Sequence, residues 1–139
     1  MKKMRLIYAV LSAAAIILEI LPYGAVLNFG VPSDDGSIET IRQTYSYFSL
    51  IPFGYANFGC FITALLTCVL LFIGILYAVK GNSALKKVIS TISLISVLSS
   101  LSPFLFGLSY ASVIGIFISI ILILEFILSI LIDNGKNCK

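Results

Sequence analysis

Residues 55–79, YANFGCFITALLTCVLLFIGILYAV, contain no charged side chain and end immediately before Lys80. An α-helix needs about 20 predominantly apolar residues to cross the hydrocarbon core of a membrane. This stretch therefore predicts a membrane-spanning helix. Similar apolar stretches occur at residues 6–28, 85–106 and 109–132.

The composition also indicates a membrane protein, because 60% of the 139 residues are hydrophobic and 11% are charged. A soluble domain has about a quarter of its residues charged. We predict an all-α integral membrane protein, a bundle of four transmembrane helices that forms one domain over residues 1–139. Residues 29–54 form its long loop and residues 133–139 its tail. Pro103 and Gly107 mark the turn between the last two helices.

The basic residues predict how the chain is oriented, since cytoplasmic segments carry an excess of Lys and Arg. Of nine such residues, all except Arg42 lie at 1–5, 80–87 or 136–139. We expect a multi-pass protein of the plasma (inner) membrane with both termini in the cytoplasm and residues 29–54 outside. The net charge of +3 is then a topology signal, and no nucleic-acid partner is expected.

The first 25 residues also fit a cleaved signal peptide, with a basic start and an apolar run. The apolar stretch continues to Asn28, beyond the roughly 7–15 residues of a typical signal-peptide core. That length favours a retained helix.

The spacing of apolar residues in the long loop predicts a further helix. Ile38, Ile41, Tyr45 and Phe48 follow helical spacing, which predicts a short amphipathic helix over residues 37–49 on the outer surface. A lid, a docking site or an interfacial anchor would each fit it.

Residues 49–53, SLIPF, resemble residues 100–104, SLSPF, and Tyr-Ala pairs follow both. This echo fits two duplicated helical hairpins, with chance similarity between apolar segments as the alternative.

Small residues recur every four positions on two of the expected helices. Such residues mark helix contact faces in lipid, because they let backbones approach closely. We predict that these two faces point into the bundle. The residues are Gly59, Thr63 and Thr67 on one helix, and Ala111, Gly115 and Ser119 on the other.

Glu19 and Glu125 are acidic residues inside the expected membrane spans. A charge at the membrane centre costs about 2.5 kcal/mol or more, so such residues are functional candidates by default. Helical rise puts them at different depths, which favours two stations of a proton path over one shared-proton pair. A protonated structural glutamate, hydrogen-bonded to a neighbour, is the alternative for each.

Hydroxyl side chains are frequent along the expected helix 85–106, where they predict tight packing or a hydrated path that ends near Glu19. Together with the glutamates, the candidate proton or ligand site contains Tyr23, Ser96 and Ser100. The hydroxyl residues are Ser90, Thr91, Ser93, Ser96, Ser99, Ser100 and Ser102.

The chain has no histidine, and Cys60, Cys68 and Cys138 form no CxxC motif. We therefore expect no metal site, no cofactor and no enzymatic activity. The leading interpretation is a non-enzymatic accessory, assembly or protective subunit that packs in the lipid bilayer against a membrane-protein partner or as a homo-oligomer. The alternative is a proton-coupled small-solute transporter or channel that uses Glu19.

Overall fold

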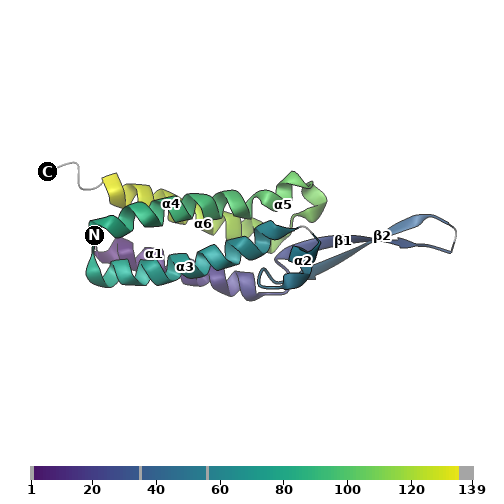
Figure 1. The fold of residues 1–139 in the computed structure, drawn as a ribbon, viewed down its shortest axis with the longest axis horizontal. Helices are drawn as coiled ribbons and strands as arrows, with labels where there is room; N and C mark the ends of the chain where they lie inside the picture. The colour runs from purple at the N-terminus through teal and green to yellow at the C-terminus, as the bar shows by residue number, and fades with distance from the viewer. Residues whose placement is uncertain (1, 35, 56, 135–139) are drawn as a thin grey trace.

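A computed structural model describes residues 2–34, 36–55 and 57–134, and it is mostly helical with one small antiparallel sheet (Figure 1). In chain order the elements are α1 (Lys2–Ile20), β1 (Ala25–Pro32), β2 (Ile38–Tyr45), α2 (Leu50–Gly54), α3 (Phe58–Lys80), α4 (Ser83–Ser100), α5 (Ser102–Leu105), η1 (Leu108–Tyr110) and α6 (Val113–Asn134). Residues 135–139, with Lys136, Cys138 and Lys139 of the expected tail, lie outside the described residues, as does Asp35.

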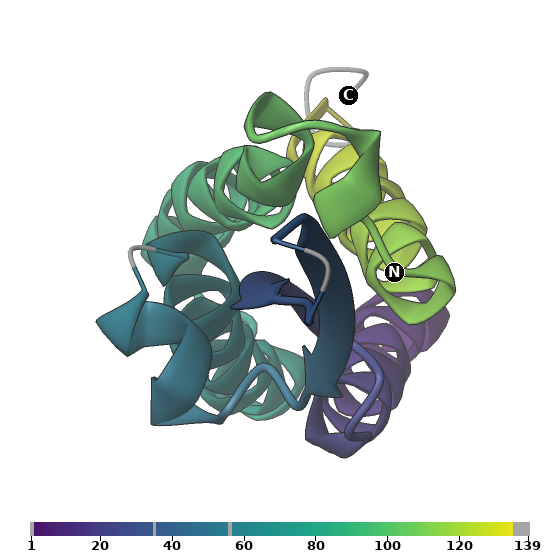
Figure 2. The ribbon, with the colours of Figure 1, turned by 90° about the vertical axis from the view of Figure 1, so that its right-hand side faces the viewer.

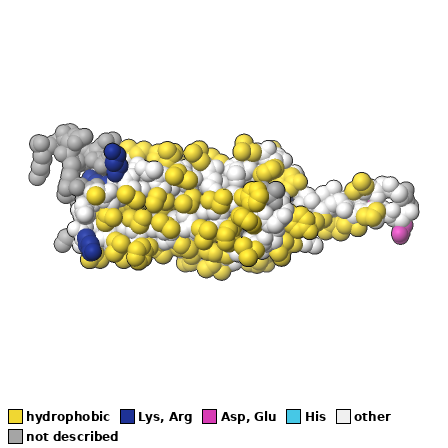
Figure 3. All heavy atoms as spheres, viewed as in Figure 1, with side chains coloured by type: hydrophobic (Ala, Val, Ile, Leu, Met, Phe, Trp, Pro, Cys, Tyr) yellow, Lys and Arg dark blue, Asp and Glu magenta, His cyan; other side chains and the backbone are white. Residues whose placement is uncertain are grey.

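Within the described residues, three helical segments are long and apolar enough to cross a membrane: Phe58–Lys80, Ala84–Leu105 and Val113–Ile132. Their outward faces carry large apolar side chains, and hydrophobic atoms cover the helical part of the molecule (Figure 3). This surface supports the prediction of a membrane protein, because a water-soluble bundle would place polar groups there. Lys and Arg side chains gather at the end of the molecule away from the sheet.

The long helices α1, α3, α4 and α6 form a closed ring. Helix α1 packs against α3 and α6, and α4 packs against the same two helices from the opposite side. Figure 2 views this ring from the side of the sheet. Tyr8, Ser12, Ala15 and Glu19 of α1 are all buried in it, so α1 is an integral part of the packing.

The prediction of an all-α fold with a helix at residues 37–49 is wrong. β1 and β2 form an antiparallel hairpin in which Ala25 pairs with Tyr45 and Pro32 with Ile38, and the hairpin projects beyond the helices (Figure 1). Helix α1 ends at Ile20 and not at residue 28, because Pro22 has no amide hydrogen to continue it. The hairpin turn contains Gly36, whose φ of 77° favours glycine.

The outer connections also differ from the expected helix bounds. The stretch 85–106 is interrupted at Leu101, where α4 ends and the short α5 begins with Pro103 near its start. Residues 108–110 form η1, so the last long helix begins at Val113 and not at residue 109. Within the two echoed segments, Pro52 of α2 and Pro103 of α5 are both buried in short helices. This local likeness is compatible with both alternatives, a duplicated hairpin and chance similarity.

Candidate functional site

The interior of the helix ring is rich in polar side chains, whereas its outside is apolar. This arrangement reverses that of a soluble bundle, and it brings several of the predicted candidates to one place. The buried polar residues that face the ring interior are Ser12, Glu19, Thr63, Thr67, Ser93, Ser96, Ser100, Ser119, Glu125 and Ser129.

Glu19, near the end of α1, is fully buried and contacts α3. Its Oε1 lies 2.8 Å from Thr67 Oγ1, and that hydroxyl also lies 2.9 Å from the carbonyl oxygen of Thr63. A threonine has only one hydroxyl hydrogen. Both contacts are hydrogen bonds at the same time when Thr67 donates to Thr63 and a protonated Glu19 donates to Thr67. The other carboxyl oxygen, Oε2, is buried and has no hydrogen-bond partner among the described residues.

Glu125, in the middle of α6, is also fully buried. It lies near Tyr8 and Ser12 of α1, but neither of its carboxyl oxygens has a partner of hydrogen-bond geometry in the described part of the chain. Ser12 precedes Glu19 by two helical turns, so the two glutamates are about 10 Å apart along the ring axis by helical rise. The structure thus places two carboxyl groups in one interior at different depths.

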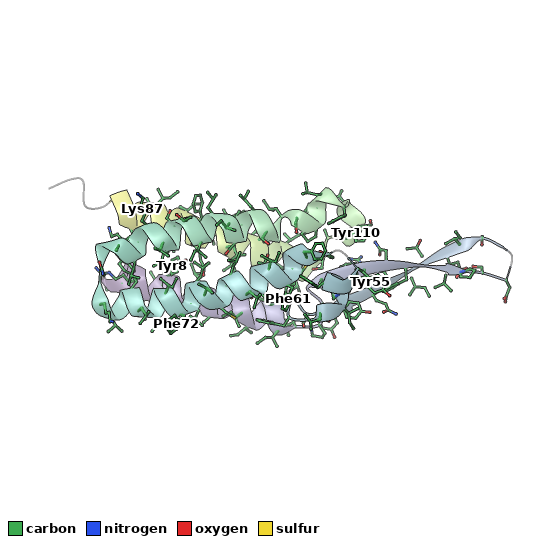
Figure 4. The ribbon with its side chains drawn as sticks, viewed as in Figure 1. Tyr8, Tyr55, Phe61, Phe72, Lys87 and Tyr110 are labelled. Atoms are coloured by element: carbon green, nitrogen blue, oxygen red, sulfur yellow. The ribbon has the colours of Figure 1, made fainter. Side chains whose placement is uncertain are left out.

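Tyr8 continues the polar interior toward the basic end of the molecule. Its hydroxyl lies 2.7 Å from Ser93 Oγ of α4, and the residue lies among the helices, far from the outer Tyr55 and Tyr110 (Figure 4). Beyond it, Arg5 stacks on the ring of Tyr77 at 4.6 Å. The sequence showed Tyr8 at helical spacing from Glu19, and nothing in it indicated the contact with Ser93 across the ring.

The remaining candidate residues do not all join this interior. Tyr23 is 58% exposed, just before the hairpin, so it does not line the interior near Glu19. Ser96 and Ser100 are buried, but their hydroxyls donate to carbonyl oxygens of α4 itself, those of Ile92 and Val97. These bonds are those expected for helix packing.

The small-residue faces lie at helix contacts inside the ring. Gly59, Thr63 and Thr67 are buried on α3, and the Gly59 carbonyl accepts a hydrogen bond from Ser99 Oγ of α4 at 3.1 Å. On α6, Gly115 and Ser119 are buried, and the Ser119 hydroxyl lies 3.0 Å from the Gly115 carbonyl. Ala111 precedes α6 and is partly buried; its carbonyl accepts from Arg42 Nη2 at 2.8 Å.

Tyr47 belongs to the same interior, so the prediction that it lies on a surface helix is wrong. It is 1% exposed, and its backbone N–H donates to the carbonyl oxygen of Glu19 at 2.9 Å. Burial raises the pKa of the Tyr47 phenol well above its usual value, so the side chain is a neutral hydroxyl at physiological pH. Three tyrosines occur between residues 45 and 55, and no periodicity distinguished this one.

A leucine at Gly115 is expected to lower thermal stability by several degrees, in line with about 1–3 kcal/mol for overpacking a filled site. A Cβ atom there would lie 2.9 Å from Ser112 Oγ, 3.1 Å from the Tyr47 hydroxyl and 3.3 Å from the Gly24 carbonyl. The measurement is thermal unfolding in detergent, with Ile116→Leu on the outer face as the control. Equal melting temperatures for the two variants would contradict the inward packing of this face.

Metal chemistry has no evident donor set in the described residues, where no group of three or more His, Cys, Asp and Glu side chains lies close enough to hold an ion. Cys60 is buried and Cys68 is exposed on the outside of α3.

Comparisons of this chain with protein-family models, with curated proteins and with solved structures find no match.

Proposed function

We propose that α1, α3, α4 with α5, and α6 each span the plasma membrane, with both termini in the cytoplasm. The ring packing of α1 supports a fourth span, because its buried face completes the interior formed by the three apolar helices. The positive-inside rule supports the orientation, since the Lys and Arg side chains seen in Figure 3 gather at the end opposite the hairpin, and Arg42 is the exception on the hairpin itself. The hairpin then extends into the extracytoplasmic space.

We propose further that the protein moves protons across this membrane, as a proton-coupled small-solute transporter or channel. The observation that carries the proposal is the pair of fully buried glutamates in a polar interior, with three carboxyl oxygens unpartnered among the described residues. Buried carboxyl groups inside a membrane bundle commonly mark proton relays. No catalytic step is required of them.

In this proposal Glu19 takes up and releases the proton, and Glu125 is a second station nearer the cytoplasm. Ser12 lies on α1 between Glu19 and the basic end and is close to Glu125. Its hydroxyl donates to the Tyr8 carbonyl at 3.2 Å in this structure, and in the proposed relay it turns from that carbonyl toward Glu125. Thr67 holds Glu19 Oε1 in place. At each step one O–H bond breaks at the donor as another forms at the acceptor oxygen, and no covalent intermediate arises.

The test is proton flux into vesicles that contain the purified protein and a pH-sensitive dye. With a potassium diffusion potential as the driving force, we expect the wild-type protein to acidify the lumen faster than protein-free vesicles do. Infrared spectra of the same vesicles should show a carboxyl band that changes with pH. A lumen pH that follows the protein-free control would reject a proton channel, and a carboxyl band that does not change with pH would also reject a proton-coupled transporter.

A second candidate function is the accessory role, in which the protein packs against a membrane-protein partner. The projecting hairpin favours it, because Val31, Ile38 and Ile41 are exposed apolar residues on strands with free edges. An isolated two-stranded hairpin is marginally stable in water, so a partner would stabilise it. The flux experiment separates the candidates, since an accessory subunit predicts no proton movement by the purified chain.

A further inference from the structure

We propose that Tyr47 is a plug, carried by the hairpin, that closes the outer end of the helix ring above Glu19. Tyr47 follows β2 after one intervening residue and enters the ring from the hairpin side. Its backbone is tied to the Glu19 carbonyl at 2.9 Å. It belongs to one buried cluster with Cys60 of α3 and with Ile118 and Leu122 of α6, and this cluster joins helices on opposite sides of the ring.

Two glycines, Gly24 and Gly115, leave room for the Tyr47 side chain because they have no Cβ atom. A Cβ at Gly24 would lie 2.8 Å from Cδ1 of the Tyr47 ring, and a Cβ at Gly115 would lie 3.1 Å from its hydroxyl. Side chains at these two positions would therefore displace the ring. The absence of side chains at these two positions thus leaves a site that fits the Tyr47 ring at the hairpin end of the helix ring.

A small cavity of about 10 Å³ adjoins the plug on its outer side. That volume is close to the minimum that holds one water molecule. Its walls contain both Tyr47 and Ser112, whose side chains supply hydroxyl groups, together with Tyr110 and Ala111 from the outer connection. Tyr47 lines this cavity and Glu19 does not, so in this proposal water that reaches the cavity meets the Tyr47 ring before it meets Glu19.

Three hydrogen bonds join the hairpin and the residue before it to the segment between α5 and α6. We call these three bonds the clasp. Arg42 Nη2 donates to the Ala111 carbonyl at 2.8 Å, and Asn28 Nδ2 donates to the Ser109 carbonyl at 3.4 Å. Ser112 Oγ donates to the Gly24 carbonyl at 2.5 Å. Because Tyr47 is covalently continuous with β2, opening this clasp and lifting the hairpin would withdraw the ring and admit water to Glu19.

The native Cys60 thiol reports directly on the plug, since it is 1% exposed and packs against Tyr47. In a background with Cys68→Ala and Cys138→Ala, a small charged methanethiosulfonate reagent is added to the outside of sealed vesicles. We expect Cys60 to be protected in wild type and in Tyr47→Phe, which keeps the ring. In Tyr47→Ala the protection should be lost.

The matched control is Tyr45→Ala, which removes a partly buried tyrosine from the end of the same strand and should leave Cys60 protected. Full labelling of every variant in denaturant establishes that the thiol is available. Protection of Cys60 in folded Tyr47→Ala would overturn the proposal, and so would equal labelling of Tyr45→Ala, which would indicate general loosening.

If Tyr47→Ala does not fold, the clasp provides an independent test. Arg42 is exposed, so Arg42→Ala breaks one clasp bond without altering the interior, and it should speed the labelling of Cys60. Thr40→Ala, at an exposed position on the same strand, is the control. Equal labelling rates for these two variants would overturn the plug.

The inference rests on the proposed function only for what the plug controls, namely the access of protons to Glu19. Labelling of Cys60 requires no transport, so the two ideas can fail separately. Loss of protection in Tyr47→Ala without any wild-type proton flux would retain the plug and reject proton transport. Proton flux that depends on Glu19, with Cys60 protected in Tyr47→Ala, would do the reverse.

Discussion

Replacing Glu19 by glutamine is expected to abolish proton flux in reconstituted vesicles while leaving the fold intact. Loss of a positioned proton-transferring group typically lowers the rate by about 100-fold or more. Glutamine has the size of glutamate, and its side-chain amide nitrogen can donate to Thr67 Oγ1 as the protonated carboxyl does. It has no proton to exchange at neutral pH, so only the transfer step is removed.

The control for this substitution is Glu39→Gln, the same chemical change at an exposed position of the hairpin. Its flux should equal that of the wild type. Glu125→Gln should also lower the flux, because the second station is removed. Wild-type flux in Glu19→Gln, with expression and melting temperature unchanged, would assign Glu19 a purely structural role.

The helices were predictable from sequence because lipid imposes a simple requirement on the chain. Residues 55–79 are apolar along their whole length, and α3 occupies Phe58–Lys80. The breaks near Pro103 were also foreseen, since proline cannot continue the backbone hydrogen bonding of a helix. The apolar content of a segment predicts that it lies in lipid, but it does not predict which helices pack against each other.

The hairpin was missed because an apolar run was read as one helix. Residues 25–28 are apolar enough to extend the first span, but Ala25, Val26 and Leu27 are buried at the base of a strand. The spacing of Ile38 and Ile41 was consistent with a helix, whereas β-branched residues at 38, 40, 41 and 44 favour a strand. The sequence Asp35-Gly36 between the two runs is a recognised hairpin turn signal that could have decided the question.

The neighbours of Glu19 could not be predicted from periodicity. The hydroxyl residues of helix 85–106 predict either tight packing or a path that ends near Glu19, but α1 packs against α3 and α6, and α4 lies across the ring. The side chain that contacts Glu19 is Thr67, which had been assigned only to a packing face. Tyr47 reaches the site through the hairpin, whose geometry follows from tertiary pairing rather than from local spacing.

Gly59 lies where α3 comes very close to α4, and we expect substitutions there to lower stability strongly. Gly59→Ala is expected to destabilise the protein by about 1–3 kcal/mol, the usual cost of overpacking, and Gly59→Leu should prevent α3 and α4 from packing. A Cβ at this position would overlap Ser102 Oγ and lie 2.8 Å from the backbone oxygen of Ser99. The hydroxyl can rotate away, but the backbone oxygen can move only with α4, so the helices must separate.

Separation of these helices would also break the bond from Ser99 Oγ to the Gly59 carbonyl and loosen the wall of the ring that holds Thr67. The measurement is reversible unfolding of the purified protein by a denaturing detergent. Gly54→Ala is the matched control, because an added Cβ there meets no atom within 4 Å, and it should unfold as the wild type does. Equal stability of Gly59→Ala and Gly54→Ala would mean that α3 and α4 are farther apart than this contact requires.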